Sequence, residues 1–264
     1  MRRGGPGASG PTAPMRGPRI AVLHHLERPF LGHAGAVLAA AGVVLDDRDV
    51  RGGDALPDLS EIDGIVSLGG EQSVLDIDDE PALGAEAALL RAAVQRDVPV
   101  LGVCLGGQLL AHALGGGVLR RARRLVAWVP LEPLDAARED PLLGALPEGA
   151  AGLHFNEDGV KLPPGAVELL RGGEHGAEAF RVGSMAWGVQ FHAEVDADVL
   201  DGWYRDWPHA LAQAGVTETQ ARAGDARHLP GQRALSEALF GGFARVVASL
   251  RPRARARSAW RGER

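Results

Sequence analysis

Val98-Pro-Val-Leu-Gly-Val-Cys104-Leu-Gly-Gly-Gln-Leu-Leu110 places the only cysteine of this 264-residue chain between an apolar run and leucines at helical spacing. A short apolar run of this kind is typical of a buried parallel strand. Gly102 and Gly106 lie two residues on either side of Cys104, where side chains would clash in a sharp strand-to-helix turn. The stretch therefore predicts a strand, a strained turn at Cys104 and a helix that ends at the glycines 115–117.

A cysteine at the start of a helix has a chemical use. The partial positive charge of the helix N-terminus favours thiolate over thiol, and the free N–H groups there can hold an oxyanion, with the Leu105 amide as one donor. Other interpretations remain, because a cysteine after an apolar strand is more often an inert buried residue. Close helix packing and phosphate binding also use glycines at a helix start. A second motif is needed to decide.

The second motif, Trp187-Gly-Val-Gln-Phe-His192-Ala-Glu194, is an apolar strand that ends in a histidine and a glutamate. Residues two apart in an extended backbone face the same side, so Glu194 can orient the His192 ring while the other ring nitrogen meets a thiol. A surface ion pair would give the same pattern. His154 is a rival base without a carboxylate two residues away, and His112 is predicted to be a residue on the face of the helix that follows Cys104.

The rest of the chain predicts an α/β fold with a mostly parallel central sheet flanked by helices. Between residues 120 and 190 the strand-like pieces, the first of which is Leu125–Leu131, are shorter and separated by Pro and Gly, which indicates a small, partly antiparallel section. Residues 196–250 have a helical pattern. Strand-like runs begin at residues 19, 43, 63 and 98, and they alternate with helical runs at 31–42, 81–96 and 105–114.

Composition predicts one domain, residues 19–250, between a disordered leader (1–18) and a basic disordered tail (251–264). The formal net charge is −6, and because the two ends carry +3 and +5, residues 19–250 carry −14, which argues against a nucleic-acid partner. The single cysteine excludes an internal disulfide and favours a cytoplasmic protein, and no apolar run is long enough to span a membrane. Met15 is an alternative translation start.

Taken together, these motifs resemble the class I glutamine amidotransferase family, especially members similar to the glutaminase portion of GMP synthase. The resemblance runs from about Arg19 to Trp207, and it also includes Val66-Ser-Leu-Gly-Gly70 and Ser73-Val-Leu-Asp76. It implies the flavodoxin-like fold of that family and a Cys104 thiolate that attacks the side-chain amide of glutamine. The resulting glutamyl thioester would be hydrolysed by water. The roles it implies for single residues are proton transfer by His192, oxyanion donors at Gly70 and Leu105, and substrate binding by Gln108, for which an ordinary helix-surface residue is the alternative.

The sequence departs from the family pattern at three positions. Ala193 replaces the usual proline of His-Pro-Glu, so a rigid φ is lost and looser positioning of Glu194 is expected. Asn156 stands where a second histidine often follows the aromatic residue, and Glu178 stands where the family has an amide. The departures at Asn156 and Glu178 concern the pocket, and none of the three replaces a residue proposed for the chemistry.

Three functions fit these observations. The first is a glutaminase that supplies ammonia to a separate synthase, because the chain is too short to include an ATP-using acceptor domain as well. The second is a free-standing hydrolase of γ-glutamyl compounds, and the third is a non-catalytic regulator with the same fold, against which the intact Cys104, His192 and Glu194 argue. No cofactor and no metal are expected. The small-molecule partner is glutamine or a γ-glutamyl compound.

Overall fold

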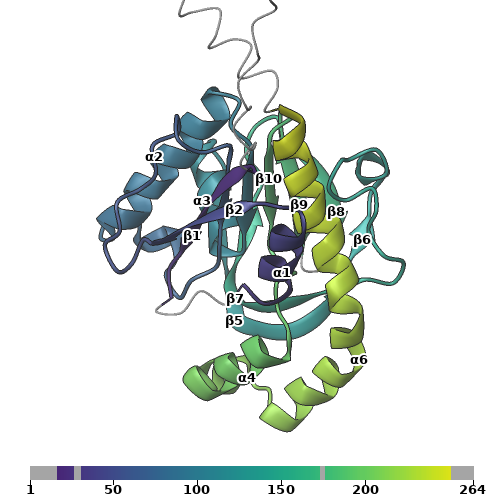
Figure 1. Ribbon diagram of the computed structural model, residues 1–264. Helices are drawn as coiled ribbons and strands as arrows, with labels where there is room; N and C mark the ends of the chain where they lie inside the picture. The colour runs from purple at the N-terminus through teal and green to yellow at the C-terminus, as the bar shows by residue number, and fades with distance from the viewer. Residues whose placement is uncertain (1–16, 27–30, 173–175, 251–264) are drawn as a thin grey trace, which may run out of the picture.

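The computed structural model describes residues 17–26, 31–172 and 176–250, and its centre is an eight-stranded sheet (Figure 1). The strand order is β2-β1-β3-β4-β10-β9-β8-β6. The first five of these strands are parallel to their neighbours, and the last three pair antiparallel. Their bounds are β1 Arg19–His24, β2 Val44–Asp49, β3 Gly64–Ser67, β4 Val100–Val103, β6 Glu132–Pro133, β8 Val167–Arg171, β9 Ala177–Val182 and β10 Ala186–Val189.

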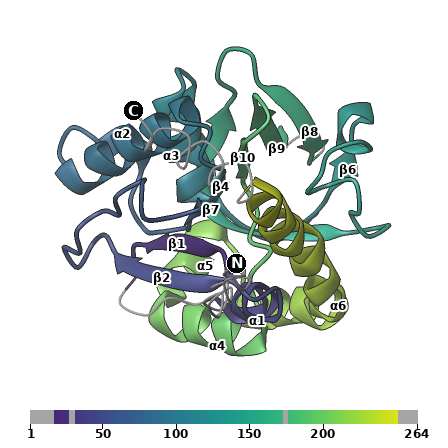
Figure 2. The same ribbon diagram turned by 45° about the horizontal axis from the view of Figure 1, so that its top comes forward.

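Helices cover both faces of the sheet. Helices α2 (Pro81–Gln95) and α3 (Leu105–Ala113) pack on one face, where their leucines join a core with Leu23 and Ile65. Helix α1 (Gly32–Ala40) and the helical residues 235–247 pack on the other, around Trp187 and Phe243. Figure 2 shows the two groups of helices on opposite sides of the strands. This three-layer arrangement explains why the parallel strands read as unbroken apolar runs.

A smaller part of the chain extends from one end of the sheet. Strands β5 (Gly117–Pro130) and β7 (Ala151–Lys161) form a separate antiparallel ribbon. Helices α4 (Ala197–Asp206) and α5 (Pro208–Ala214) pack against it through a third apolar cluster that contains Trp203 and Tyr204. In Figure 1 this part lies at the bottom, below the sheet. The long helix α6 (Glu218–Ser236) leads from it back along the sheet and continues through a π-helical segment, η4 (Glu237–Gly241), as far as residue 250.

The predicted α/β fold, with its mostly parallel sheet and small antiparallel section, is confirmed. The first strand of the ribbon is longer than the sequence predicts, because β5 begins at Gly117 and not near residue 125. The predicted leader lies outside the described residues except for Gly17 and Pro18, and the predicted tail lies outside them entirely. Among the described residues, no helix combines the length and the apolar character that a bilayer crossing requires. The remaining short helical turns are η1 Val74–Asp76 and η2 Asp135–Ala137.

Candidate active site

Cys104 lies where β4 passes into α3, at the carboxyl ends of the parallel strands. Its backbone has φ 53° and ψ −110°, a conformation that non-glycine residues rarely adopt and that costs free energy. The glycines around it are required by space: a Cβ on Gly102 would meet the backbone of Gly106, and a Cβ on Gly106 would meet the Ser67 carbonyl. The strained turn that the glycine pattern predicts is therefore present, and it is held between two strands and a helix.

His192 follows β10, the neighbour of β4, and its ring is held on one side by Glu194. A hydrogen bond of 2.6 Å joins His192 Nδ1 to Glu194 Oε1, and both side chains are buried. The His192 backbone is fixed as well, because its N–H donates to Leu153 O at 2.8 Å and its carbonyl accepts from Gln232 Nε2 at 2.7 Å. The sequence motif thus forms a local, buried His–Glu pair and not a surface ion pair.

The other side of the His192 ring faces Cys104. Burial disfavours the charged ring, but the charge of Glu194, the charge of Cys104 and the hydrogen bonds from both raise the pKa of His192 to about 10. This shift favours the protonated ring, and Nδ1 of that ring is hydrogen-bonded to Glu194. The proton on the other ring nitrogen is directed at Cys104. It can therefore be donated to a leaving group on a carbon that Cys104 attacks.

Ala193 stands between these two residues in place of the proline of the family pattern. The Glu194 carbonyl accepts a 2.7 Å hydrogen bond from the His33 N–H at the start of α1. Glu194 itself is only 3% exposed. A tertiary contact thus restrains the backbone at the point where the sequence lacks proline.

The glycine turn after β3 lies against both the ring and the thiol. A Cβ on Gly69 would be 2.9 Å from His192 Cε1 and 3.5 Å from Cys104 Cβ, so only glycine leaves room for the ring. A Cβ on Gly70 would be 2.9 Å from Leu105 Cδ2, which places Gly70 next to the first residue of α3. Leu105 is at the helix N-terminus, where N–H groups have no partner within the helix. Gly70 and Leu105, the two residues predicted to supply oxyanion donors, are therefore neighbours, and both line a cavity with Cys104.

Gln108 is buried and not on the helix surface. Its Nε2 donates to Asp158 O and to Gln190 Oε1, both at 3.1 Å. Gln190 in turn places its Nε2 3.8 Å from Cys104 Sγ. Sequence reasoning gave Gln190 no role, although it precedes His192 by two residues and the same-side rule that was applied to Glu194 would have found it.

Neither the rival base His154 nor the helix residue His112 lines the two cavities at Cys104. His154 is fully buried in β7, where its Nε2 lies 2.8 Å from Glu178 Oε2 and its Nδ1 lies 3.1 Å from Asn156 Oδ1. His112 is on α3, two turns beyond Cys104. Two residues that depart from the family pattern, Asn156 and Glu178, are thus partners of His154.

A third buried pair of a histidine and a glutamate, not predicted from the sequence, supports the glycine turn. His25 Nε2 lies 2.7 Å from Glu86 Oε2, and Ser67 Oγ donates to Glu86 Oε1 at 2.7 Å. His25 also limits the space beside Gly70, since a Cβ there would be 2.7 Å from His25 Cβ. This network ties the ends of β1 and β3 to α2, and no local sequence signal marks it because its members are 19 to 61 residues apart.

Two cavities meet at Cys104. The larger, of about 320 Å³, is the aromatic lobe. The smaller, of about 160 Å³, is the polar lobe. The lining of the aromatic lobe includes His192, Glu194, Phe155, Trp203 and Trp207. The lining of the polar lobe includes Leu105, Gln108, Ser73, Arg120 and Asp158.

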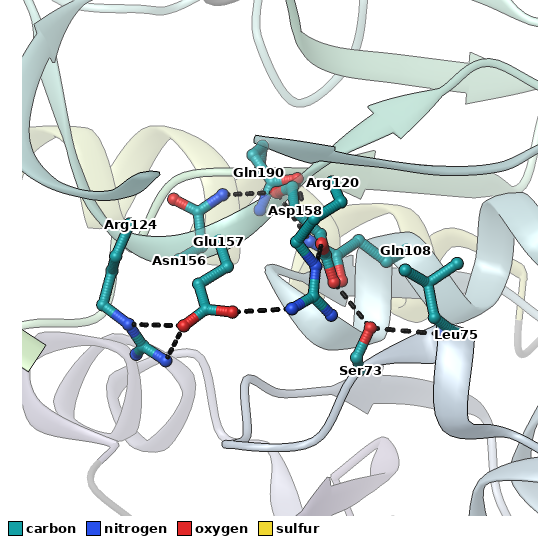
Figure 3. Close-up of polar contacts among 9 residues, drawn as sticks. All are labelled: Ser73, Leu75, Gln108, Arg120, Arg124, Asn156, Glu157, Asp158 and Gln190. Atoms are coloured by element: carbon teal, nitrogen blue, oxygen red, sulfur yellow. Dashed lines mark hydrogen bonds and ion pairs between the residues drawn. The ribbon is translucent and has the colours of Figure 1, made fainter. Parts of the chain in front are cut away.

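The polar lobe contains paired charges (Figure 3). Arg120 lies between two carboxylates, with 2.8 Å to Glu157 and 2.6 Å to Asp158. Ser73 donates to the second oxygen of Asp158 at 2.6 Å, and Arg124 contacts Glu157 at 2.8 Å. A cation and an anion side by side, with a buried amide nearby, form a site that can bind a zwitterion.

The aromatic lobe is built by residues from two separate segments. Phe155 comes from β7 and Trp203 from α4, with ring centroids 5.3 Å apart, and Trp207 lies 6.0 Å from Trp203. Trp203 also packs edge-on against the His192 ring at 4.7 Å. The aromatic rings thus border the space next to the histidine.

The sequence and the fold are similar to those of known proteins. The chain is 32% identical over 193 residues to the glutamine-hydrolysing GMP synthase of Porphyromonas gingivalis, with 64% of this chain but only 34% of that protein covered. It is 36% identical over 151 residues to one of the subunits of the glutamine-hydrolysing GMP synthase of Haloarcula marismortui, with 56% and 73% covered.

A solved glutamine amidotransferase from Thermotoga maritima has the same fold. It superposes with a TM-score of 0.76 at 24% identity and covers 87% of this chain and 97% of that one. The sequence model of the family described as glutamine amidotransferase class-I matches residues 43–202, which include Gly70, Cys104, His192 and Glu194. The chain therefore belongs to the class I glutamine amidotransferase family.

Proposed function

We propose that the chain hydrolyses the side-chain amide of glutamine, with Cys104 as nucleophile, His192 as proton carrier and Glu194 as the residue that orients it. The observation that carries this proposal is the His192 ring held between the Glu194 carboxylate and Cys104. In the first step the thiolate attacks the amide carbon, a C–S bond forms and the C–N bond breaks. The leaving nitrogen takes its proton from His192 and departs as ammonia.

The second step regenerates the enzyme. His192, now neutral, takes a proton from water, and the hydroxide attacks the glutamyl thioester, so that glutamate leaves and the Cys104 thiolate is restored beside the imidazolium. In both steps negative charge develops on the former amide oxygen. We assign the binding of this oxygen to the N–H groups of Gly70 and Leu105, because stabilisation of such a charge is commonly the largest single catalytic contribution.

The amino-acid end of glutamine would bind in the polar lobe. Asp158 suits the α-ammonium and Arg120 suits the α-carboxylate, because each would exchange part of an existing ion pair for one with the substrate. Gln108 would hold the substrate from the side of α3. The extended side chain then brings its amide to Cys104, at the junction with the aromatic lobe.

We further propose that the ammonia serves a separate acceptor enzyme. Support comes from the Haloarcula relative, which is named as one subunit of a GMP synthase. The chain spans about a third of the length of the Porphyromonas GMP synthase, and the matched part corresponds to one portion of that protein. A glutaminase that feeds another enzyme wastes glutamine when it works alone, so a partner is expected to complete or activate the site.

The test is ammonia release from glutamine by the pure protein, measured alone and with candidate synthases and their substrates. We expect slow release alone and an increase of more than about tenfold with the right partner, which corresponds to about 1.4 kcal/mol of barrier. Cys104→Ala serves as the blank. Absence of Cys104-dependent ammonia release under every condition would contradict the proposal.

A further inference from the structure

The two lobes differ in which reacting groups they contain, and this difference orients a substrate. Leu105 and Gln108 line the polar lobe and not the aromatic one, whereas His192 lines the aromatic lobe and not the polar one. Cys104 lines both. A carbonyl carbon attacked by Cys104 therefore has an acyl side in the polar lobe and a leaving-group side next to His192.

The leaving group must lie on the side of the histidine. The departing nitrogen takes its proton from His192, and proton transfer requires hydrogen-bond distance between the two nitrogens. Whatever else is attached to that nitrogen then extends into the aromatic lobe. In glutamine the side-chain amide nitrogen carries only hydrogens, so nothing extends into this lobe. The aromatic lobe, however, encloses about 320 Å³, roughly ten times the ~30 Å³ that a water-sized molecule occupies in the liquid.

The lining of the aromatic lobe indicates what would fill this space. Phe155, Trp203 and Trp207 present rings at mutual centroid distances of 5.3 to 6.3 Å, and offset or tilted packing of a further ring on such a group is favourable. Two charged residues at its border, Arg124 and Glu71, also line the polar lobe, and they are paired with Glu157 and Arg51. The lobe therefore suits an apolar ring better than a charged group.

We infer that the site also accepts γ-glutamyl amides whose amine carries an aromatic ring, with the ring bound among Phe155, Trp203 and Trp207. This inference rests on the proposed function, because it uses the same nucleophile and proton carrier. Cys104 forms the C–S bond, the C–N bond breaks, and the amine leaves with the proton of His192. Water then hydrolyses the thioester, so that one amide and one water give glutamate and the ring-bearing amine.

The experiment compares γ-glutamylbenzylamide with γ-glutamylmethylamide, two substrates that differ chiefly in the ring. The wild-type protein is expected to show a kcat/KM at least about tenfold higher for the benzylamide, the size of preference that an apolar pocket gives for added apolar groups. Glutamate release is measured for both, with Cys104→Ala as the blank. Equal kcat/KM values for the two amides in the wild-type protein would overturn the inference without any variant.

Two tryptophan variants test where the ring of the benzylamide binds. Trp207→Ala is expected to bring the ratio of the two kcat/KM values close to one. Trp128→Ala is the matched control: Trp128 is also half-buried and packs on the same part of the chain, stacked on His228, but it does not line the aromatic lobe. It should leave the ratio unchanged. Trp207→Leu provides a second variant if Trp207→Ala does not fold.

The outcomes separate this inference from the proposed function. A benzylamide preference that survives in both Trp207 variants, or that Trp128→Ala removes equally, would overturn the placement of the ring. Hydrolysis of glutamine without any benzylamide preference would overturn the inference and leave the proposed function intact. If neither glutamine nor either amide shows Cys104-dependent turnover, the proposed function itself fails.

Discussion

Replacement of Cys104 by alanine is expected to lower ammonia release from glutamine by about 10³-fold or more, to the background of the assay. Removal of a nucleophile that forms a covalent intermediate has effects of this size, since the remaining groups cannot form the thioester. Cys104 is the only cysteine, so no neighbouring thiol can replace it. The measurement is ammonia production at saturating glutamine, with the synthase present if one is needed.

The control for this variant uses the strain at the turn. Alanine at position 104 must keep φ near 53°, whereas glycine adopts this conformation without penalty. Cys104→Gly should therefore be as inactive as Cys104→Ala and more stable, by about 1 kcal/mol in the free energy of unfolding. A Cys104→Gly variant that is stable but inactive shows that activity is lost because the thiol is missing and not because the protein unfolds. Residual activity within tenfold of wild type in either variant would exclude Cys104 as the nucleophile.

Replacement of His192 by alanine is expected to reduce kcat by about 10³-fold as well, because the proton for the leaving nitrogen comes from this ring. Glu194→Gln should have a smaller effect, since Glu194 orients the ring and stabilises its charge but transfers no proton itself. The measurement is kcat and KM for glutamine on each variant, after circular dichroism has shown that it is folded.

His154→Ala is the matched control for His192→Ala. Both histidines are buried and both contact a glutamate, at 2.8 Å for His154 and 2.6 Å for His192. Loss of His154 leaves Glu178 as a buried carboxylate without its partner, so stability should fall, but turnover by the folded fraction should remain substantial. An inactive His154 variant together with an active His192 variant would mean that the base has been assigned to the wrong strand.

The local parts of the site could be predicted from the sequence. The turn at Cys104 depends on glycines within two residues, and the contact of His192 with Glu194 depends on the alternation of an extended chain. The layers of the fold follow from apolar runs that alternate with helical ones. Each of these features is set by neighbours in the sequence, where periodicity and glycine placement carry the information.

Features assembled from distant segments could not be predicted. The early start of β5 is an example: residues 120–124 include four arginines and show no apolar alternation, yet Arg120 and Arg124 are held in the ribbon by Glu157 and Asp158 of β7. The aromatic lobe likewise joins Phe155 to tryptophans about 50 residues later in the chain. Such contacts depend on tertiary packing, which a single sequence does not reveal.

Covalent trapping tests the central claim most directly. A glutamine analogue with a chloromethyl ketone in place of the side-chain amide places an electrophilic carbon at the junction of the two lobes. Intact-mass and peptide mass spectrometry should then show one adduct per chain, located at Cys104, whose formation is slowed by glutamine and strongly reduced in His192→Ala. A folded protein that forms no adduct at Cys104, or forms it at the same rate with saturating glutamine, would contradict the account.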